Sequence, residues 1–368
     1  MVKVMFIGDL QMKINFSEMY VDDGIKKAVL KILDSGRYIK GHELEIFEKE
    51  FADFCTSKFG VGVSSGTSAI LLSLIAAGIK KGDEVIVPSH TFIASASPAK
   101  FLGCTPVYAD IDPETYTMDV DHLKKLISSK TKAIIPVHLY GHPVDMKPLL
   151  EIAEDKGLFV IEDACQAHAA EYRGKKTGSL GDVGCFSFFP SKNMTVAGDG
   201  GMITTNNDEL ADKLSMLRDH GRKDKYIHEI LGLNFRLSEI PAAVGREQLK
   251  HLPGWTDKRR KAAAKYNELL EGIVETPKEA KWAKHVYHLY VIQTDDRDGL
   301  SNHLNQQGIS TGVHYPVPVH RQPCMDAGKL KLPVTDACVD RILSLPMHPQ
   351  LKDEEIEYVA EKIKEWKK

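Results

Sequence analysis

The chain of 368 residues contains 48 Lys and Arg against 51 Asp and Glu, and 43 % of its residues are hydrophobic. This composition is typical of a globular enzyme with two domains, and the net charge of −3 argues against nucleic acid or a membrane surface as partner. Six cysteines without a C-x-x-C pair favour reduced thiols. Since no apolar run is long enough for a signal peptide or a membrane span, we expect a cytoplasmic protein, with Met12 as a candidate start.

The first predicted elements are two helices, which follow an N-terminal extension over residues 1–20. Apolar side chains recur at helical spacing in residues 21–33 and again in residues 44–54. The pair Ser35-Gly36 predicts the end of the first helix, and the loop RYIKG, residues 37–41, separates the two.

Residues 59–78, FGVGVSSGTSAILLSLIAAG, predict a short strand, a turn of small residues and a helix that begins near Thr67. Free backbone N–H groups at a helix N-terminus, with Ser and Thr hydroxyls, favour a bound phosphate, although the same pattern also serves as a plain helix cap. The glycines do not complete the dinucleotide fingerprint, because Gly66 comes one residue late and no acidic residue ends a second strand about twenty residues later. This spacing disfavours a nicotinamide-dependent oxidoreductase.

Three further strands are predicted in residues 84–87, 106–109 and 132–137. A helix after Thr91 completes the alternation of strand and helix that is typical of a parallel sheet. Phe92 lies just beyond the first of these strands, where it either stacks on a planar ring or packs in the core.

His138 and His142 have the i, i+4 spacing of a helical metal-binding pair. Gly141 and Pro143 prevent a helix at this point of the chain. We therefore predict no metal site.

Two apolar runs in the middle of the chain each lead to a charged side chain. Residues 158–161 predict a buried strand, and Glu162 and Asp163 follow it at once. Residues 183–189 predict a second strand, with Lys192 just beyond it. In open α/β sheets, ligands bind at the carboxyl ends of the strands. The acid and the amine form either a plain ion pair or the centre of a pyridoxal phosphate (PLP) enzyme, which needs a lysine to hold the cofactor and an aspartate to keep its ring nitrogen protonated.

The second half of the chain predicts a change of domain. The glycine turn AGDGG, residues 197–201, leads into another strand, and Ser238 predicts the start of a helix. We place a boundary near residue 250, between a large domain of residues 21–250 and a small domain of residues 251–368. The elements expected in the small domain are a charged helix in residues 255–270, a strand in residues 288–292, a helix from Leu300 and a final amphipathic helix containing Ile356, Val359, Ala360 and Ile363.

Eight motifs occur in order along the chain: SGRYIKG, SSGTSA, GDEVIVPSHTFIAS, HLYGHPVDM, IEDACQAHAA, GSLGDVGCFSF followed by SKN, GLNFRLSE and GVHYPVPVH. With these motifs the sequence resembles, over nearly its whole length, the DegT/DnrJ/StrS family of PLP-dependent sugar-nucleotide aminotransferases. The resemblance implies the α/β fold of the fold type I PLP-dependent transferases. Such a fold has a large domain with a mostly parallel central sheet flanked by helices, and a smaller C-terminal α/β domain.

The resemblance also implies roles for individual residues. Lys192 matches the lysine that forms the Schiff base with PLP, and Asp163 matches the partner of the pyridine nitrogen. Gln166 matches the contact to the phenolic oxygen of the ring, and Phe92 falls on the position that stacks on the ring. The residues that match phosphate contacts are Gly66, Thr67, Ser68 and Ser187.

Asn234 matches an asparagine that reaches the phosphate of the neighbouring subunit, so the resemblance implies a homodimer with shared active sites. The sequence departs from the family pattern at Cys165 and His168, where alanine and glycine are commoner. Neither position carries the chemistry.

The activity that the resemblance implies is transfer of an amino group from L-glutamate to a nucleotide-linked keto-sugar, in the synthesis of polysaccharide or glycan precursors. Some relatives have histidine in place of the lysine and act as dehydratases, so Lys192 favours transamination. HYPVPVH and SLPMHP look most like the branch that aminates 3-keto sugars linked to UDP or dTDP, including UDP-2-acetamido-3-keto-glucuronate.

The candidate contacts to the sugar are Tyr38, Arg236, His314 and Tyr315. Arg236 would pair with the carboxylate of a uronate, whereas Tyr38 also fits a core tyrosine and His314-Tyr315-Pro316 also fits a turn. Three other functions stay open: a PLP-dependent sugar dehydratase or amino-acid lyase, a 4-keto sugar aminotransferase, and a non-catalytic regulator with the same fold.

Overall fold

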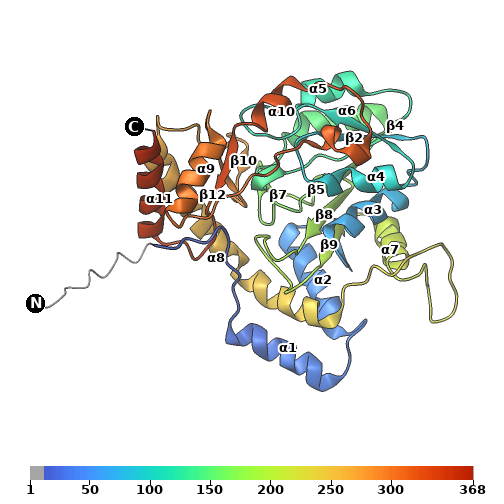
Figure 1. Ribbon diagram of the computed structural model, residues 1–368. Helices are drawn as coiled ribbons and strands as arrows, with labels where there is room; N and C mark the ends of the chain where they lie inside the picture. Colours follow the sequence, from blue (N-terminus) through green and yellow to red (C-terminus); the bar gives the residue numbers. More distant parts are fainter. Residues whose placement is uncertain (1–11, 368) are drawn as a thin grey trace, which may run out of the picture.

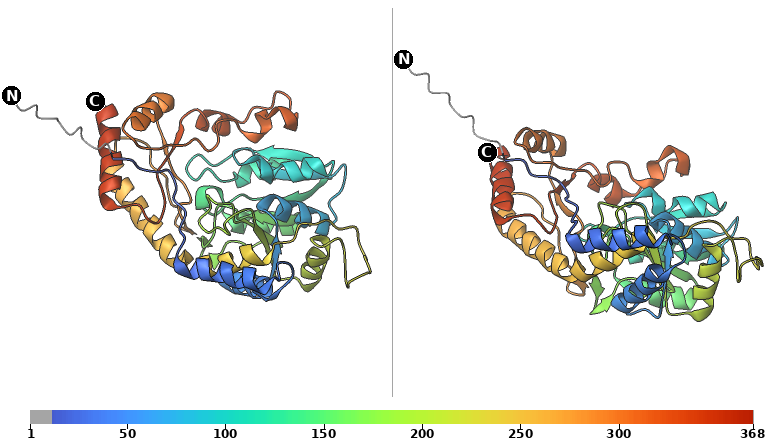
Figure 2. Two further views of the ribbon diagram at one scale, coloured as in Figure 1. Left: turned by 60° about the horizontal axis from the view of Figure 1, so that its bottom comes forward. Right: turned by 90° about the horizontal axis from the view of Figure 1, so that it is seen from below.

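The computed structural model describes residues 12–367, so residues 1–11 of the predicted N-terminal extension lie outside the described part (Figure 1). Helices α1 (Asp23–Ser35) and α2 (His42–Cys55) confirm the first two predicted elements. Gly36 ends α1 with φ of 64°, in the left-handed region that favours glycine. Both helices pack against the long helix α8 (Glu239–Leu270), and Figure 2 shows α1 lying beside it.

A seven-stranded sheet with the order β1-β9-β8-β5-β4-β2-β3 forms the centre of the molecule. Strands β3, β2, β4, β5 and β8 pair in parallel, whereas β9 is antiparallel to both β1 and β8. This mostly parallel sheet confirms the predicted fold class. Its strands are β1 (Phe59–Val63), β2 (Glu84–Pro88), β3 (Thr105–Ala109), β4 (Thr131–Ile134), β5 (Phe159–Asp163), β8 (Val183–Ser187) and β9 (Gly201–Thr205).

The register of the strands brings several strand ends to one edge of the sheet. Val63 at the end of β1 pairs with Gly201, and Gly201 pairs with Ser187 at the end of β8. On the other side of β8, Asp163 at the end of β5 pairs with Cys185. The turn after β1, the end of β5 and the end of β8 therefore lie together.

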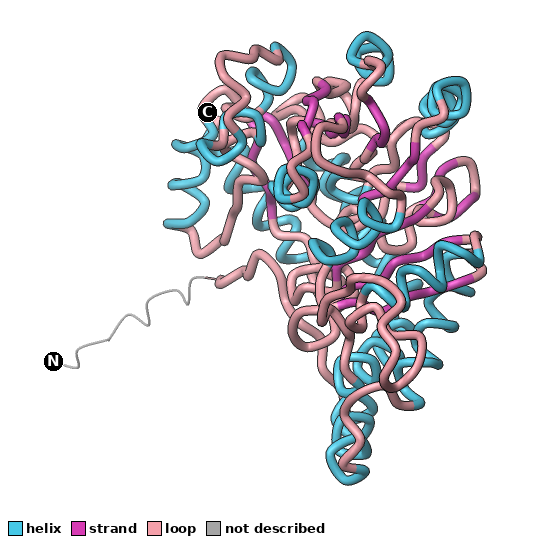
Figure 3. Tube along the Cα trace, turned by 90° about the vertical axis from the view of Figure 1, so that its right-hand side faces the viewer, coloured by secondary structure: helices cyan, strands magenta, loops and turns pink. Residues whose placement is uncertain are grey.

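Helices cover both faces of the sheet (Figure 3). Val85 and Val87 belong to the core under one set of helices and Ile86 to the core under another, because successive side chains of a strand point to opposite faces. The first core takes side chains from α3 (Gly66–Ala76), α4 (Ser97–Phe101) and α7 (Asp208–Leu217). Cores on the opposite face take side chains from α5 (Val120–Leu126), α6 (Met146–Lys156), α2 and α8.

Helix α8 corrects the prediction of a separate helix in residues 255–270. One helix of 32 residues begins after Ser238, as predicted, and continues through Pro253 to Leu270. A proline inside a helix costs a backbone hydrogen bond, but the packing of α8 against α1, α2 and α11 keeps the helix continuous through Pro253. The expected domain boundary at residue 250 thus falls within a continuous helix, and the division into domains stays a prediction.

A second apolar core lies around the C-terminal half of α8 and contains Tyr266, Tyr290 and Ile14. Ile14 pairs with Ile309, which ties the segment before α1 to this core. The surrounding elements are α9 (Arg297–Gln306), α11 (Asp353–Trp366) and an antiparallel pair of β11 (Tyr290–Gln293) with β12 (Ile342–Leu345).

Short elements complete the fold. They are β6 (Glu171–Tyr172), β7 (Lys175–Lys176) and β10 (Ala283–Lys284) in a small sheet, the helix α10 (Pro333–Cys338), and the single turns η1 (Ile93–Ser95), η2 (Leu139–Gly141), η3 (Val319–Arg321) and η4 (Pro323–Met325). Within residues 12–367, none of the helices combines the length and the apolar character needed to cross a bilayer.

Candidate active site

A cavity of about 410 Å³ lies at the edge of the sheet where β1, β5 and β8 end. It brings together predicted residues from distant parts of the chain: Gly66, Thr67, Phe92, Asp163, Gln166, Ser187, Lys192, His314 and Tyr315. Asp163 and Lys192, which carry opposite charges, therefore line the same cavity.

The two adjacent carboxylates at the end of β5 have different surroundings, because alternate strand residues point to opposite faces. Glu162 is fully buried and accepts hydrogen bonds from His138 Nε2 at 2.9 Å and from the backbone N–H groups of residues 178, 180 and 181. Asp163 lines the cavity and accepts from the Ser95 hydroxyl at 2.6 Å and from the Cys165 N–H at 3.1 Å. Glu162 is therefore a structural group, and Asp163 is the one available to a ligand.

Lys192 lies just beyond β8 and is half-buried. Burial lowers the pKa of Lys192 from its ordinary value, while the nearby Cys165 and Asp163 act in the opposite direction. Within residues 12–367, its Nζ atom has neither a hydrogen-bond partner nor an ion-pair partner. A lysine with a lowered pKa reaches the neutral, nucleophilic form more readily than an exposed lysine.

The turn between β1 and α3 supplies the N-terminus of a helix to the cavity. Ser65 caps α3 by accepting from the N–H of Ser68 at 3.1 Å, and Gly66 and Thr67 line the cavity. A Cβ atom on Gly66 would lie 2.7 Å from Cys165 Sγ and 2.8 Å from Ser187 Cβ, so only glycine fits there. The turn packs directly against the end of β8, which places the Ser187 hydroxyl beside the helix N-terminus.

Aromatic and polar side chains form the opposite wall. The rings of Phe92 and Tyr315 lie 5.6 Å apart, and Phe92 is 52 % exposed, which removes the alternative that it packs in the core. Gln166 Nε2 donates to the Tyr315 hydroxyl at 3.0 Å. His314 Nδ1 lies 2.9 Å from Ser344 Oγ, and burial lowers the pKa of His314 to about 4, so its ring is neutral at neutral pH.

Four predicted residues do not line this cavity: Ser68, Tyr38, Asn234 and Arg236. The Ser68 hydroxyl donates to the carbonyl of Ser65 at 2.8 Å, within the helix cap. Tyr38 is 45 % exposed and its hydroxyl donates to the carbonyl of Leu33, so it is not a core tyrosine. The roles of all four stay predictions.

Asn234 and Arg236 lie in one segment next to a buried carboxylate. Asp219 is 1 % exposed and forms ion pairs with Arg236, Lys40 and Arg222. Burial alone would raise the pKa of Asp219, but hydrogen bonds from these three cations hold it well below its usual range. The Asn234 side chain is exposed. This segment lies beside the end of β1, where Arg236 pairs with Val63, but neither Asn234 nor Arg236 lines the cavity of its own chain.

Sequence reasoning missed Ser95, which lines the cavity, and Tyr140, which does not line it but contacts a residue that does. Ser95 lies in η1 and orients Asp163, and Tyr140 lies in η2 and donates its N–H to Gln166 Oε1 at 2.8 Å. Both occur inside the quoted motifs, yet neither belongs to a residue pattern that predicts chemistry. Their partners are 68 and 26 residues away, so the tertiary fold alone reveals them.

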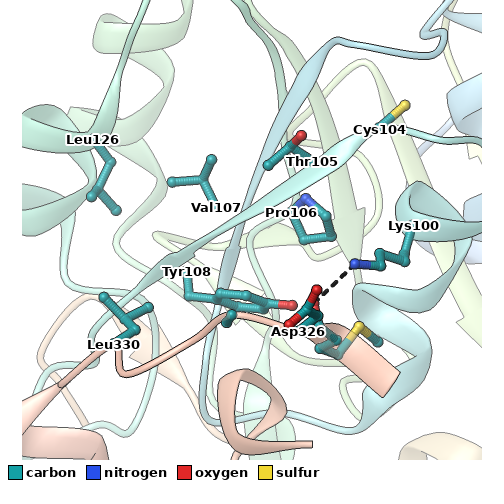
Figure 4. A pocket seen from close by; sticks show the side chains of 11 residues that line it. Lys100, Cys104, Thr105, Pro106, Val107, Tyr108, Leu126, Asp326 and Leu330 are labelled. Carbon is teal, nitrogen blue, oxygen red and sulfur yellow. Dashed lines mark hydrogen bonds between the residues drawn. The ribbon is translucent and has the colours of Figure 1, made fainter. Parts of the chain in front are cut away.

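A second cavity, of about 320 Å³, lies at the edge strand β3 and takes lining residues from α4 and from the segment after η4. Figure 4 shows its lining, in which Lys100 Nζ donates to the carbonyl of Met325 at 3.1 Å. None of the predicted site residues lines it. Among the described residues no group of acidic, Cys and His side chains is placed to hold a metal ion.

A model of the DegT/DnrJ/EryC1/StrS aminotransferase family matches residues 20–364. The chain belongs to this family. Among its relatives is a "pleiotropic regulatory protein" of Geobacillus stearothermophilus, 44 % identical over 96 % of this chain and 97 % of that protein. A dTDP-3-amino-3,4,6-trideoxy-alpha-D-glucose transaminase of Streptomyces venezuelae is 45 % identical over 92 % of this chain and 91 % of that protein. A UDP-2-acetamido-2-deoxy-3-oxo-D-glucuronate aminotransferase of Pseudomonas aeruginosa is 39 % identical over 92 % of this chain and 95 % of that protein.

Solved structures agree with this membership. The crystal structure of S. venezuelae DesV in complex with a ketimine intermediate has a TM-score of 0.94 at 42 % identity and covers 97 % of this chain and 99 % of its own. The NtdA structure from Bacillus subtilis, which has bound cofactor PMP, has a TM-score of 0.87 at 34 % identity and covers 94 % of this chain and 81 % of its own. The protein is a fold type I, PLP-dependent aminotransferase.

The residues of the cavity fit this cofactor. The helix N-terminus at Gly66 and Thr67, with the Ser187 hydroxyl, suits a phosphate dianion. Asp163 suits a protonated ring nitrogen, and Lys192 suits the attachment of the aldehyde carbon. Because Gly66 has no side chain, the helix N-terminus can lie close to Ser187, so both can contact the same phosphate group.

Proposed function

We propose that the protein transfers an amino group from L-glutamate to a nucleotide-linked 3-keto sugar. The observation that carries the proposal is the single cavity that contains the Lys192 amine, the Asp163 carboxylate and the N-terminus of α3. This arrangement serves transamination, because both half-reactions need the same lysine to move a proton and the same acid to hold the ring proton.

Bound PLP supplies an electron sink for the negative charge that develops at the substrate carbon. Asp163 holds the ring proton, and the Ser95 hydroxyl fixes the orientation of its carboxylate. With the cofactor bound, the Lys192 amine would be placed to take a proton from the substrate carbon as a general base and to return a proton as a general acid. Its lowered pKa favours the neutral amine that this base needs.

Two relatives support a sugar aminated at carbon 3, since their names specify a 3-amino and a 3-oxo sugar. UDP-2-acetamido-3-keto-glucuronate is one candidate within this class. Arg236 Nη1 is bonded to Asp219, whereas Arg236 Nε is buried without a partner in the described part of the chain. A uronate carboxylate recognised by Arg236 would therefore share the guanidinium group with Asp219.

We further propose a homodimer in which the segment around Asn234 completes the site of the second copy. The loop before Asn234 exposes large apolar side chains, with Leu231 at 97 % and Tyr226 at 78 % exposure. Such side chains are typical of a surface that a partner covers. The six free cysteines support a reducing, cytoplasmic location, and the sugar product suggests a role in polysaccharide or glycan synthesis.

The test is a panel of UDP- and dTDP-linked 3-keto and 4-keto sugars, with L-glutamate as donor and product mass as readout. The proposal predicts a mass change of a keto group to an amine with at least one 3-keto sugar. Conversion of 4-keto sugars alone would indicate a 4-keto sugar aminotransferase. A product mass that corresponds to loss of water would indicate a dehydratase.

A regulatory role is the second candidate, because a relative that is 44 % identical is named a regulatory protein. Complementation of a deletion strain distinguishes the regulatory role from the enzymatic one. An allele carrying Lys192→Ala should restore the wild-type phenotype only if the function of the protein does not need transamination.

A further inference from the structure

Tyr140 lies behind the active-site cavity and does not line it. It occupies the single turn η2 with φ of 59°, an uncommon conformation for a residue other than glycine, and it is 3 % exposed. This conformation directs its backbone N–H and its side-chain hydroxyl to two different segments of the cavity wall.

The contacts of Tyr140 form a closed ring. Its N–H donates to Gln166 Oε1 at 2.8 Å, and Gln166 Nε2 donates to the Tyr315 hydroxyl at 3.0 Å. The hydroxyl of Tyr140 bonds to the carbonyl oxygen of His314, which precedes Tyr315 in the chain. Tyr140 thereby joins Gln166, at the cofactor end of the cavity, to His314 and Tyr315.

Elementary chemistry fixes the direction of these bonds. A carbonyl oxygen only accepts, so the Tyr140 hydroxyl donates its proton to His314. The bond of 2.6 Å between Tyr140 Oη and His90 Nε2 then requires that His90 donates. Burial lowers the pKa of His90 to about 4, so His90 is neutral with its proton on Nε2.

The ring of His314 and its backbone carbonyl are held by different contacts. Phe16 stacks on the His314 ring at 5.4 Å, and Ser344 Oγ contacts Nδ1. Within residues 12–367, the carbonyl oxygen of His314 accepts a hydrogen bond from the hydroxyl of Tyr140. Loss of that hydroxyl therefore removes the hydrogen bond to the His314 carbonyl, while the pairing of Gly312 with Ser344 and the contacts of the His314 ring remain.

We propose that Tyr140, oriented by His90, is a positioning residue that holds His314 and Tyr315 for the keto-sugar half of the reaction. This inference rests on the proposed function, in which His314 and Tyr315 contact the sugar. The glutamate half depends on Lys192, Asp163 and the cofactor, which the Tyr140 hydroxyl does not touch.

The test compares Tyr140→Phe with the wild-type holoenzyme in two single-turnover experiments. The absorbance of the cofactor is recorded while L-glutamate converts it to the amine form. It is recorded again while the keto-sugar identified in the substrate panel converts it back to the aldehyde form. We expect reconversion to slow about tenfold at low sugar concentration, the loss typical of one hydrogen bond. The rate of conversion by L-glutamate should stay within about twofold of the wild-type rate.

Tyr116→Phe is the matched control. Tyr116 is equally buried and its ring lies 5.6 Å from that of Tyr140, but its hydroxyl accepts from Gln293 Nε2 and does not reach the cavity wall. It should leave both half-reactions unchanged. Equal slowing of both half-reactions in Tyr140→Phe, or of neither, would overturn the inference.

A second pair of variants carries the test if Tyr140→Phe does not fold. His90→Leu removes the hydrogen-bond donor to Tyr140 and should slow only the half-reaction with the keto-sugar. His90→Gln keeps an N–H donor and should keep the rate of that half-reaction close to wild type. Equal rates for these two variants would contradict the inference. A wild-type enzyme that converts no keto-sugar would instead reject the proposed function, so the two failures are distinguishable.

Discussion

The two walls of the active-site cavity differ in how they are built. One wall consists of strand ends and one helix N-terminus, and its key groups, Asp163, Ser187 and Lys192, lie at or just beyond β5 and β8. The other wall consists of His314 and Tyr315, which reach the cavity from a loop and depend on Tyr140 and Gln166 for their position. Regular structure fixes the first wall, and long-range hydrogen bonds fix the second. Changes to the first should therefore abolish chemistry, and changes to the second should alter sugar use.

Lys192→Ala should have the largest effect, because it removes the amine that we propose holds the cofactor and moves the proton. We expect a loss of more than about 10³-fold in kcat. Steady-state assays with the best sugar measure this loss. Lys100→Ala, which changes the rim of the cavity at β3, is the control and should keep wild-type activity.

Asp163→Asn and Glu162→Gln sharpen the comparison within one strand. Asp163→Asn should lower kcat by about 10²-fold to 10³-fold while the thermal midpoint stays close to wild type. Glu162→Gln should instead lower the free energy of unfolding by about 3 kcal/mol, because it disrupts a buried network with His138 and three N–H groups. Activity and thermal melting of both variants decide the point. A reversed pattern would mean that the two carboxylates exchange roles.

Ser95→Ala should have a smaller effect in the same direction as Asp163→Asn. The variant removes the 2.6 Å hydrogen bond to Asp163 Oδ2 and leaves the carboxylate in place. We expect kcat to fall about tenfold, the loss typical of a hydrogen bond to a charged group. Ser95→Thr, which keeps a hydroxyl, should recover part of the rate, and failure of any rescue would point to a packing effect.

Acid should destabilise the fold through its buried histidines. Burial lowers the pKa of His90 to about 4 and of His168 to about 3, below the ordinary 6.5. The unfolded chain then binds more protons below pH 6.5, so stability is complete above that pH and falls as pH drops towards 4. Thermal midpoints measured across this window should decline steeply, and a flat profile would contradict the assignment.

His168→Met should reduce this acid sensitivity. His168 is fully buried among Phe51, Phe186 and Phe188, and its two ring nitrogens have no hydrogen-bond partner within residues 12–367. An apolar side chain of similar volume removes the need to keep a histidine neutral. The midpoint of acid unfolding, followed by circular dichroism, should move to lower pH. The exposed His42→Met is the control and should leave that midpoint unchanged.

The sequence predicted the first wall of the cavity in some detail, because strand ends follow from local patterns. The apolar runs before Asp163 and Lys192, and the Ser-Gly turn before α3, each locate a functional group without knowledge of the tertiary fold. The second wall was predicted only as far as the motif containing His314 and Tyr315. Its supports, Tyr140 and His90, have no local signature, because their partners are set by packing.

Two other differences have equally physical causes. Helix α8 passes through the expected boundary at residue 250 because its contacts with α1 and α2 outweigh the cost of Pro253. The ion pair of Arg236 with Asp219, which is 17 residues earlier in the chain, was not predicted, and the contact of Arg236 with the sugar stays a prediction. Whether a second copy presents Asn234 and Arg236 to a neighbouring site is a property of an assembly, and a single sequence pattern does not determine it.

The central claim is that Lys192 holds the cofactor opposite Asp163. Borohydride reduction of the PLP-loaded enzyme, followed by protease digestion and peptide mass spectrometry, tests it directly. The account predicts that the peptide containing Lys192 alone carries the added mass of the reduced cofactor. Labelling of a different lysine, or no labelling of a fully loaded enzyme, would contradict it.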